Sequence, residues 1–575
     1  FIQFIFIFIS LLIMNRLISL NTTRSSFKFF GKGMRSYSTS SSTQQTGRGF
    51  NKVLIFGGII GLGLTTATVT YYNNTSVQRV VEGLQRLGTS MWTGTLVTFD
   101  YKYNLMGVEP DSPEEAEIYK TIHTRAANRV LDLCRKNGGL YIKGGQYLAS
   151  LNHILPKEYT DTLSELQDSA PHYPFTMVER VFEQDFNIPI KEKFREFDEI
   201  PIAAASLAQV HRAVTLNGEE VAVKVQYEPL RGQFKGDMLT HRLIFYLLSK
   251  LFPGYDFTFA EGEMEEILAT ELDFCNEASN AERARKNLSV ENVYIPKIFY
   301  DLSSERVLTC EFIHGCKIND KKRIEELGLD LKKVSYSMLK AFSEQIYIHG
   351  FFHADPHPGN VLVREHPDKK GIHQVVLLDH GLYKDMSNDL RLTWCKLWKA
   401  MIEKDEKTIS DCTVELELDP TCSDTLVNMI LMRSHNDSTR VGLGSGMTEE
   451  EIKMLQENAK HKMGEFVEIL KIVPPAIWLV LRNNNLLRSV NQDLGVPVNR
   501  FLIMAREAVK GMNTNLDEEK ASSWSDSVSS TYHSLKFETR LAAFLFSYWM
   551  MDLFISFLIK IGKVKEVELE ELIDA

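Results

Sequence analysis

The chain has 575 residues, of which 44% are hydrophobic and 24% charged, and its formal net charge is -10. This length exceeds a single core and predicts several structural units, and the composition excludes wholesale disorder. The acidic balance argues against nucleic acid as a partner, because binding to its phosphates depends on Lys and Arg. The seven cysteines form no C-x-x-C pair. We therefore expect reduced, mostly buried thiols rather than a zinc site or a disulfide framework.

The amino-terminal region has the composition of a targeting segment. The chain begins at Phe1, and we interpret Met14 as the start of translation. From Met14 to Val81 there is no Asp or Glu, whereas Arg and Lys recur through sequence rich in Ser and Thr. This composition predicts that residues 1–52 form a mitochondrial targeting segment. A disordered linker is the alternative.

An apolar stretch follows at residues 53–72, VLIFGGIIGLGLTTATVTYY. It is long enough to span the ~30 Å hydrocarbon core of a bilayer, so we predict a transmembrane anchor, with a buried or interfacial segment as the alternative. Arg48 and Lys52 precede it. By the positive-inside rule they predict a single-pass protein of the inner membrane whose body faces the intermembrane space.

A second apolar stretch lies near the end of the chain, at residues 541–562. It contains Asp552 near its middle, and a charge at that depth is costly in a bilayer. We therefore predict a buried or membrane-facing helix rather than a span. It belongs to a carboxy-terminal region of linker and helices, residues 511–575.

The body of the chain changes pattern along its length. Residues 113–168 have helical periodicity, within a predicted helical extension, 73–170. VHRAVTLNGEEVAVKVQY predicts two strands joined by an Asn-Gly turn. A helix over 262–287 and two strand-like runs complete a predicted N-lobe, 171–313. Helices interrupted by the strand QVVLLD form a predicted C-lobe, 314–510. This layout predicts an α+β, two-lobed protein-kinase-like fold with an added helical extension and a largely helical C-terminal lobe.

Phosphoryl transfer needs a lysine for the phosphates, ligands for Mg²⁺ and a carboxylate near the attacking oxygen. VAVK puts Lys224 at the end of the second predicted strand. In HADPHPGN, Asp355 and Asn360 have the separation found in the kinase catalytic loop, and VVLLDHG supplies Asp379 at the D-F-G position. We predict Lys224 and Asp355 as catalytic, Asn360 and Asp379 as Mg²⁺ ligands, and ATP or ADP as the nucleotide.

The stretch AAASLAQV stands where a kinase has its glycine-rich phosphate loop. Ala203, Ala205 and Ala208 occupy the glycine positions and Val210 the valine position. Because the Cβ of alanine makes a positive φ costly, we expect a stiffer loop with an altered grip on the nucleotide.

Histidines near these carboxylates allow a different chemistry. A metal-dependent hydrolase would use as ligands His353, Asp355, His357 and His380. That alternative leaves the strand lysine and the two-lobed layout unexplained. We favour a hydrogen-bonding role for His353 in fixing the loop, and a loop-shaping role for His357.

Together these motifs resemble the UbiB or aarF-domain-containing kinases, an atypical kinase-like family of bacteria, mitochondria and plastids. The resemblance runs from about Asn137 to Arg500. KGGQYLAS looks like the family's K-x-G-Q element, AAAS its alanine-rich loop, ELDFCNEASNAER its E-x-D helix and HADPHPGN its catalytic loop. LDHGLY and LRNNNLLRSV are similar to the mitochondrial branch, which has His380 where most of the family has Phe.

The resemblance implies roles for residues that spacing alone does not assign. Glu277 would pair with Lys224 across an insertion of about one helix, and Lys143 would reach Glu271 and Asp273. The element carrying Gln146 would then cover the cleft used by peptide substrates. Without the resemblance, Lys143, Glu271 and Asp273 would be read as exposed helix charges worth under ~1 kcal/mol each. The implied nucleotide site comprises Ala203, Ala204, Ala205, Ser206, Ala208, Val210, Lys224 and Glu311.

The function implied is that of a mitochondrial serine/threonine-protein-kinase-like protein that carries out Mg²⁺-dependent phosphoryl transfer or ATP hydrolysis. The process would be membrane lipid or quinone homeostasis or mitochondrial morphology, with membrane lipids and proteins of quinone or lipid metabolism as partners. A noncatalytic nucleotide-binding scaffold is the alternative. Asp355, Asn360 and Asp379 together favour the enzyme, because a scaffold has no chemical need for all three.

Overall fold

The computed structural model describes residues 75–109, 112–149, 156–168, 173–251, 261–431, 469, 471–495, 498–514, 535, 536, 538, 539 and 542. The described residues fall into two compact units. One lies within Phe1–Ala149, Pro156–Leu166 and Pro229–Pro253, and the other within Ser150–Leu155, Gln167–Glu228 and Gly254–Ala575. These units cut across the predicted N-lobe, 171–313, because residues 229–253 group with the amino-terminal helices.

Three predictions concern residues that the structure does not describe. The predicted targeting segment 1–52 and the predicted anchor 53–72 lie outside the described residues, as does the apolar stretch 541–562 apart from position 542. Within the part of the chain that is described, no helix combines the length and apolar character needed to cross a membrane.

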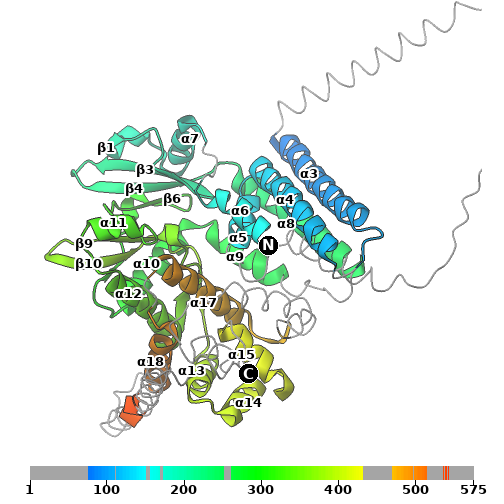
Figure 1. Ribbon diagram of the computed structural model, residues 1–575. Coiled ribbons are helices and arrows are strands. Elements are labelled where there is room, and N and C mark those ends of the chain that lie inside the picture. The colour runs from blue at the N-terminus through cyan, green and yellow to red at the C-terminus, as the bar shows by residue number, and fades with distance from the viewer. Residues whose placement is uncertain are drawn as a thin grey trace, which may run out of the picture. The chain divides into compact units, whose positions relative to one another are not determined.

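The first unit is helical. Its helices are α3 (Thr75–Asn104), α4 (Pro113–Asn137), α5 (Leu140–Ala149), α6 (Lys157–Asp168) and α8 (Leu230–Leu251). The helical periodicity predicted over residues 113–168 is confirmed by α4, α5 and α6. Figure 1 shows α3, α4 and α8 side by side, and α3 packs against both of the others. The break between α4 and α5 falls at Gly138 and Gly139, whose φ angles are 64° and 50°. These values favour glycine.

A buried ion pair attaches α8 to the amino-terminal helices. Arg86 of α3 donates from Nε to Asp237 Oδ1 at 2.7 Å and from Nη2 to Oδ2 at 2.5 Å. The side chains of Arg86 and Asp237 are 10% and 3% exposed. Removing one partner of such a pair leaves an uncompensated buried charge. This pair therefore explains why α8, which follows the strand β4 (Glu220–Gln226) in the sequence, belongs to this unit.

The second unit begins with a sheet in which the strand order is β1-β3-β4-β6, with β2 paired to β3. The predicted hairpin is confirmed as β3 and β4, and Gly218 in its Asn-Gly turn has a φ of 88°. Helix α7 packs its buried residues on one face of this sheet. The bounds are α7 (Phe175–Phe186), η1 (Ile190–Glu192), β1 (Phe194–Phe197), β2 (Ala203–Ala204), β3 (Ala208–Thr215), β4 (Glu220–Gln226), η4 (Tyr300–Leu302) and β6 (Val307–Glu311).

The predicted single helix over 262–287 is wrong, because the chain forms α9 (Glu261–Glu271) and α10 (Phe274–Asn287) there. Asp273 separates them, since it has extended backbone angles and its side chain accepts a hydrogen bond from the backbone N–H of Cys275 at 2.9 Å. An aspartate in this position is a helix N-cap. The insertion between β4 and α10 is correspondingly larger than the one helix expected, because it holds both α8 and α9.

Two smaller sheets follow. In the first, the order is β5-β10-β9-β7, and in the second β8 pairs with β11. The two strand-like runs predicted after α10 belong to different sheets. β5 pairs in parallel with β10, whereas β6 pairs with β4 and completes the first sheet. The bounds are β5 (Val293–Tyr294), β7 (Cys316–Lys317), β8 (Phe351–His353), β9 (Val361–His366), β10 (Lys369–Leu377) and β11 (Tyr383–Asp385).

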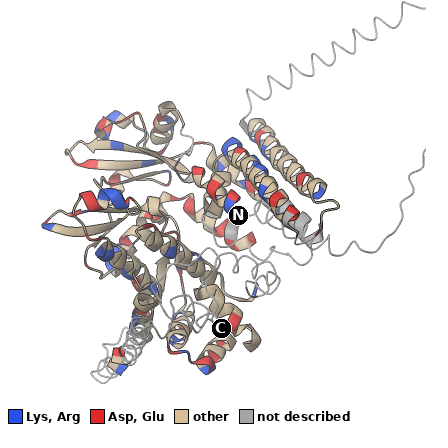
Figure 2. Ribbon diagram, in the orientation of Figure 1, with Lys and Arg blue, Asp and Glu red and all other residues tan. Residues whose placement is uncertain are grey.

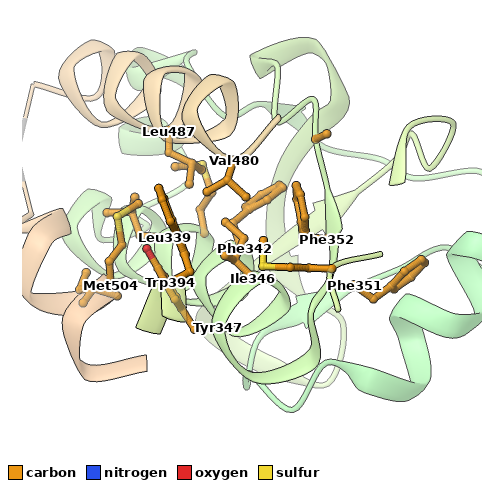
Figure 3. Close-up of a cluster of buried hydrophobic side chains, with 14 of the residues drawn as sticks. Leu339, Phe342, Ile346, Tyr347, Phe351, Phe352, Trp394, Val480, Leu487 and Met504 are labelled. Carbon is orange, nitrogen blue, oxygen red and sulfur yellow. The ribbon is translucent and has the colours of Figure 1, made fainter. Parts of the chain in front are cut away.

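The remainder of the second unit is helical and contributes most of an extensive apolar core, to which α10 and several strands also contribute. Figure 3 shows side chains of α12, α13, α17 and α18 meeting there, among them Phe342, Trp394, Val480 and Met504. The elements of this region are α11 (Lys321–Glu326), α12 (Leu331–Glu344), η5 (Gln345–His349), η6 (Pro358–Asn360), α13 (Asn388–Glu403), α14 (Glu406–Glu415), η7 (Pro420–Cys422), α15 (Ser423–Leu431), α17 (Pro475–Asp493) and α18 (Arg500–Met512).

A turn of π-helix, η5, links this core to the strand β8. The carbonyl of Tyr347 in this turn accepts a hydrogen bond from Nη1 of the buried Arg391 at 2.8 Å, and Arg391 also donates to the carbonyl of Gly511 at 2.7 Å. A Cβ at Gly511 would lie 2.1 Å from the Tyr347 oxygen. The absence of a side chain at Gly511 therefore lets α18 approach the π-turn.

We expect Gly511→Ala to lower the free energy of unfolding by about 1–3 kcal/mol, because the new methyl group overlaps backbone atoms that Arg391 holds in place. Chemical denaturation of the full chain measures this change. Gly262→Ala is the control, since a Cβ at Gly262 meets nothing within 4 Å. This substitution should stabilise α9 by up to about 1 kcal/mol, because alanine favours a helix more than glycine does. Equal effects of the two substitutions would contradict the packing argument.

Candidate nucleotide and metal site

Strand β4 positions Lys224 by simple alternation. Val221, Val223 and Val225 point into the core under α7 and are at most 1% exposed. Because successive side chains of a strand alternate between faces, Lys224 points from the opposite face. Its ammonium lies 5.1 Å from the centroid of the Phe274 ring, at the start of α10.

The Lys224 ammonium is shared by two carboxylates. It lies 2.9 Å from both oxygens of Glu277 on α10 and 3.1 Å from Oδ2 of Asp379. The side chain of Glu277 is 4% exposed, whereas those of Lys224 and Asp379 are 19% and 33% exposed. Glu277 is therefore an internal anchor for the lysine, while Asp379 stays accessible to a ligand.

Burial and charge act in opposite directions on this group. Burial lowers the pKa of Lys224, but Asp379 and Glu277 outweigh it and hold that pKa above its usual range. Burial raises the pKa of Glu277 to about 7, although the charge of Lys224 lowers it. The two shifts have different main causes, because burial dominates for Glu277 and the two neighbouring carboxylates dominate for Lys224.

One imidazole joins the segments that carry Asp355 and Asp379. The His353 Nε2–H donates to the backbone carbonyl of Asp379 at 2.8 Å, and His353 Nδ1 accepts from the backbone N–H of Asp355 at 2.8 Å. The backbone N–H of His353 donates to Gln345 Oε1 of the π-turn at 2.9 Å. The predicted hydrogen-bonding role of His353 is confirmed, and its neutral Nε2–H tautomer follows from these partners.

The same loop places Asn360 next to Asp379. Leu378, the residue before Asp379, donates its backbone N–H to the Asn360 carbonyl at 2.9 Å. Within the loop, the Gly359 N–H donates to His357 Nδ1 at 3.1 Å, which confirms the predicted loop-shaping role of His357. The amide oxygen of Asn360 and the carboxylate of Asp379 are hard ligands of the kind that Mg²⁺ prefers. The residues present thus fit this metal.

His380 is engaged within the protein rather than available to a metal. Its Nε2–H donates to the Leu377 carbonyl at 3.1 Å, and its Nδ1 accepts from the Tyr383 hydroxyl at 3.0 Å. Burial lowers the pKa of His380 to about 3, so the ring is neutral. Both ring nitrogens of His353 are also bonded to protein groups. Across the described ranges, no group of three or more His, Cys, Asp or Glu is arranged to hold a metal ion. The hydrogen bonds of the His353 and His380 rings to protein groups argue against their use as ligands in a metal-dependent hydrolase.

The alanine-rich loop is a tight hairpin. Ala203 and Ala204 pair with Val210 and Gln209, and the Ala205 N–H donates to the Ala208 carbonyl at 2.8 Å. None of these alanines has a positive φ. Ser206 and Ala208 are buried, and Ala203 is exposed. The turn closes without glycine geometry, while contact of the loop with a nucleotide stays a prediction.

Glu311 lies at the end of β6, where its carboxylate is held by the protein. The Tyr294 hydroxyl donates to it, and Arg364 lies 3.9 Å from its Oε1. Its backbone N–H donates to the Lys297 carbonyl at 2.9 Å. The predicted contact between Glu311 and a nucleotide stays a prediction.

The residues expected to cover and regulate the cleft, Lys143, Gln146, Glu271 and Asp273, are divided between the two compact units. Lys143 and Gln146 lie on α5 of the first unit, where Gln146 Nε2 donates to the Leu166 carbonyl at 2.8 Å. Glu271 ends α9 in the second unit and is buried, and Asp273 caps α10. The pairing of Lys143 with Glu271 and Asp273 remains a prediction.

Helix α17 supplies two residues that the sequence did not single out. Arg482 Nη2 lies 3.0 Å from Asp355 Oδ1, and Asn483 Nδ2 donates to the His353 carbonyl. Their signal was the run LRNNNLLRSV, which places several polar residues on a helix. The sequence does not show that these polar side chains are buried. In the structure, Asn483, Asn484 and Asn485 are at most 3% exposed.

These contacts define the class of protein. A strand lysine paired with a helix glutamate, a loop carrying Asp355 and Asn360, and an aspartate after the following hairpin are the arrangement of a protein-kinase-like fold. The α+β kinase-like fold is as predicted.

Comparison with known proteins identifies the family. A model of the ABC1 atypical kinase-like domain matches residues 165–413. "Probable serine/threonine-protein kinase abkD" of Dictyostelium discoideum is 45% identical over 478 residues, covering 83% of this chain and 68% of that protein. "AarF domain-containing protein kinase 1" of Xenopus laevis is 38% identical over 449 residues, covering 77% of this chain and 85% of that protein. The chain therefore belongs to the ABC1 or AarF family of atypical kinase-like proteins.

A solved complex of Rv3197 with erythromycin from Mycobacterium tuberculosis aligns with 69% of this chain and 99% of its own. The identity is 20% and the TM-score 0.41.

The raised pKa of Glu277 predicts a pH dependence. Nucleotide binding should strengthen as the pH rises through about 7, because ionised Glu277 is needed to anchor Lys224. The stability contribution has the opposite sign. Since the folded-state pKa lies above the ordinary value of 4.5, that contribution is complete below pH 4.5 and is lost as the pH rises through about 7.

Titration of ATP binding against pH, with parallel denaturation curves, measures both trends. Glu277→Gln should remove both inflections. Glu282→Gln should leave them unchanged, since Glu282 lies on the same helix but pairs with Arg285. An inflection that persists in Glu277→Gln would show that another group is responsible.

Proposed function

We propose that this protein binds ATP with Mg²⁺ and transfers or hydrolyses its terminal phosphoryl group. The observation that carries the proposal is the position of the Lys224 ammonium between Glu277 and Asp379. A lysine used only for stability has no need of a second, accessible carboxylate. A phosphate-binding lysine next to a metal ligand does.

Each residue then has a distinct task. Glu277 holds Lys224 in place so that the ammonium can bind nucleotide phosphates, and the alanine-rich hairpin lies along the same sheet. Asp379 and Asn360 would hold Mg²⁺, which supplies charge neutralisation between the phosphate oxygens. His353 fixes the backbones on either side, so Asp355 keeps its position relative to Asp379.

The role of Asp355 is to orient an acceptor oxygen and accept its proton. The acceptor can be a serine or threonine hydroxyl, as the name of the Dictyostelium relative suggests, or water. A Ser/Thr kinase and an ATPase therefore use the same residues. The noncatalytic scaffold would bind the nucleotide with these groups but would not turn it over.

Asp379→Asn tests this function. The substitution keeps the size of the side chain but removes the negative charge that a metal ligand supplies, so Mg²⁺-dependent ATP binding and turnover by the full chain should be lost. Calorimetry measures the binding, and phosphate release measures the turnover.

Asp385→Asn is the control, because Asp385 lies on β11 and pairs with Arg283 at the surface. Unchanged turnover in Asp379→Asn would reject the proposal. Binding without turnover in the unaltered chain would favour the scaffold.

We also propose that the protein works at a mitochondrial membrane, on lipid or quinone homeostasis or on mitochondrial morphology. The acid-free, basic composition of residues 14–81 supports a mitochondrial location.

The exposed face of α3 supports contact with a membrane. Figure 2 shows this helix mostly in tan, with few charges. Trp92, Phe99 and Tyr103 are each 65% exposed, and α3 begins at Thr75, shortly after the apolar stretch 53–72. Aromatic side chains of this kind are typical of membrane interfaces.

Fluorescence quenching tests contact between α3 and lipid. In vesicles whose acyl chains carry bromine, part of the tryptophan emission of the full chain should be quenched, and Trp92→Phe should remove much of that quenching. Trp394→Phe is the control, because Trp394 is fully buried in the helical core. Equal quenching in the unaltered chain and in Trp92→Phe would contradict lipid contact at this face.

A further inference from the structure

Helix α17 holds the loop of Asp355 at two consecutive residues. Arg482 is paired with the Asp355 carboxylate at 3.0 Å, and its neighbour Asn483 donates to the His353 carbonyl. The side chains of Arg482 and Asp355 are 11% and 15% exposed. A partly buried, charge-assisted contact of this kind is stronger and better defined than a fully exposed ion pair. Arg482 therefore has a fixed place beside the carboxylate that would orient the acceptor.

The loop itself supplies no permanent cation. Its sequence, HADPHPGN, contains neither Lys nor Arg, and the Lys224 ammonium is held by Glu277 and Asp379. During phosphoryl transfer, negative charge is spread over the three equatorial oxygens between the leaving and attacking atoms. A cation on the acceptor side stabilises that charge only if it lies next to the group that orients the acceptor. Arg482 is in that place.

We propose that Arg482 is a catalytic residue that donates to the phosphoryl group while it is transferred. This inference rests on the function proposed above and adds a residue to it. A guanidinium has five N–H donors in a planar fork, so it can bind two anions at once. One is the carboxylate of Asp355, and the other is the phosphoryl group. An arginine supplied in this way raises kcat by roughly 10³-fold or more in other phosphoryl-transfer proteins.

The step balances without a further reactant. The bond between the γ-phosphorus and the bridging oxygen breaks, and that oxygen keeps the electron pair as ADP leaves. The acceptor oxygen forms a new bond to phosphorus and gives its proton to Asp355, which later returns it to solvent. Arg482 keeps its protons throughout, because a guanidinium does not deprotonate in proteins.

Steady-state ATP turnover by the full chain tests the inference. Arg482→Ala should lower kcat by roughly 10³-fold or more and change the KM for ATP little, because the contact forms mainly in the transition state. Arg482→Lys should recover only part of kcat, since an ammonium lacks the planar fork. Added guanidinium ion should raise turnover in Arg482→Ala but not in the unaltered chain.

Arg488→Ala is the matched control. Arg488 lies on the same helix and is buried, but its Nη2 donates to Asn485 Oδ1 at 2.9 Å. Its loss should lower stability while kcat in the remaining folded protein is retained. A merely structural role for Arg482 would give the same result as Arg488→Ala, with no rescue by guanidinium.

Three outcomes would overturn the inference. Unchanged kcat in Arg482→Ala would show that the guanidinium takes no part in the reaction. A higher kcat would show that it masks Asp355. No turnover in the unaltered chain would reject the proposed function, and this inference with it. The first two outcomes reject this inference alone, whereas the third also rejects the proposed function.

Discussion

The structure of the site depends on one ammonium group that two carboxylates share. Lys224, Glu277 and Asp379 come from a strand, a helix and the end of a hairpin, at separations of 53 and 155 residues from the lysine. A charge is expensive to bury without partners, so none of the three can move inward independently. The second carboxylate leaves an excess of negative charge, and that excess is what a divalent cation can relieve. The arrangement is stable enough to fold and is still suited to binding a ligand.

The surrounding fold fixes these charges through neutral groups. His353 carries no charge in its present contacts, yet it connects the backbones of Asp355 and Asp379 and is itself held by the π-turn and by α17. His380 is kept neutral by burial. In a site with several charges, neutral donors and acceptors orient the backbone without changing the electrostatic balance. This division of tasks accounts for two buried histidines beside carboxylates.

Local signals in the sequence predicted local structure well. The Asn-Gly turn specified the β3–β4 hairpin, because its φ requirement and the alternation of valines act over a few residues. The separation of Asp355 and Asn360 identified the loop for the same reason. Asp273 was missed as a helix cap, since the helical pattern continues across it.

Contacts between residues far apart in the sequence could not be predicted from local patterns. Spacing could not pair Glu277 with Lys224, because α8 and α9 lie between them, and only the family resemblance did so. The contact between Arg482 and Asp355 joins residues 127 positions apart, and no local pattern encodes it.

The membership of α8 in the first unit affects the order in which the chain can fold during synthesis. Arg86 emerges from the ribosome early, but its partner Asp237 follows only after the strands β1 to β4 have been made. Domains form as units when their last segment is available. The amino-terminal helices must therefore wait, with a charged group lacking its counterion, while part of another unit is translated. A nascent chain stalled before residue 237 would expose this incomplete bundle to chaperones and proteases.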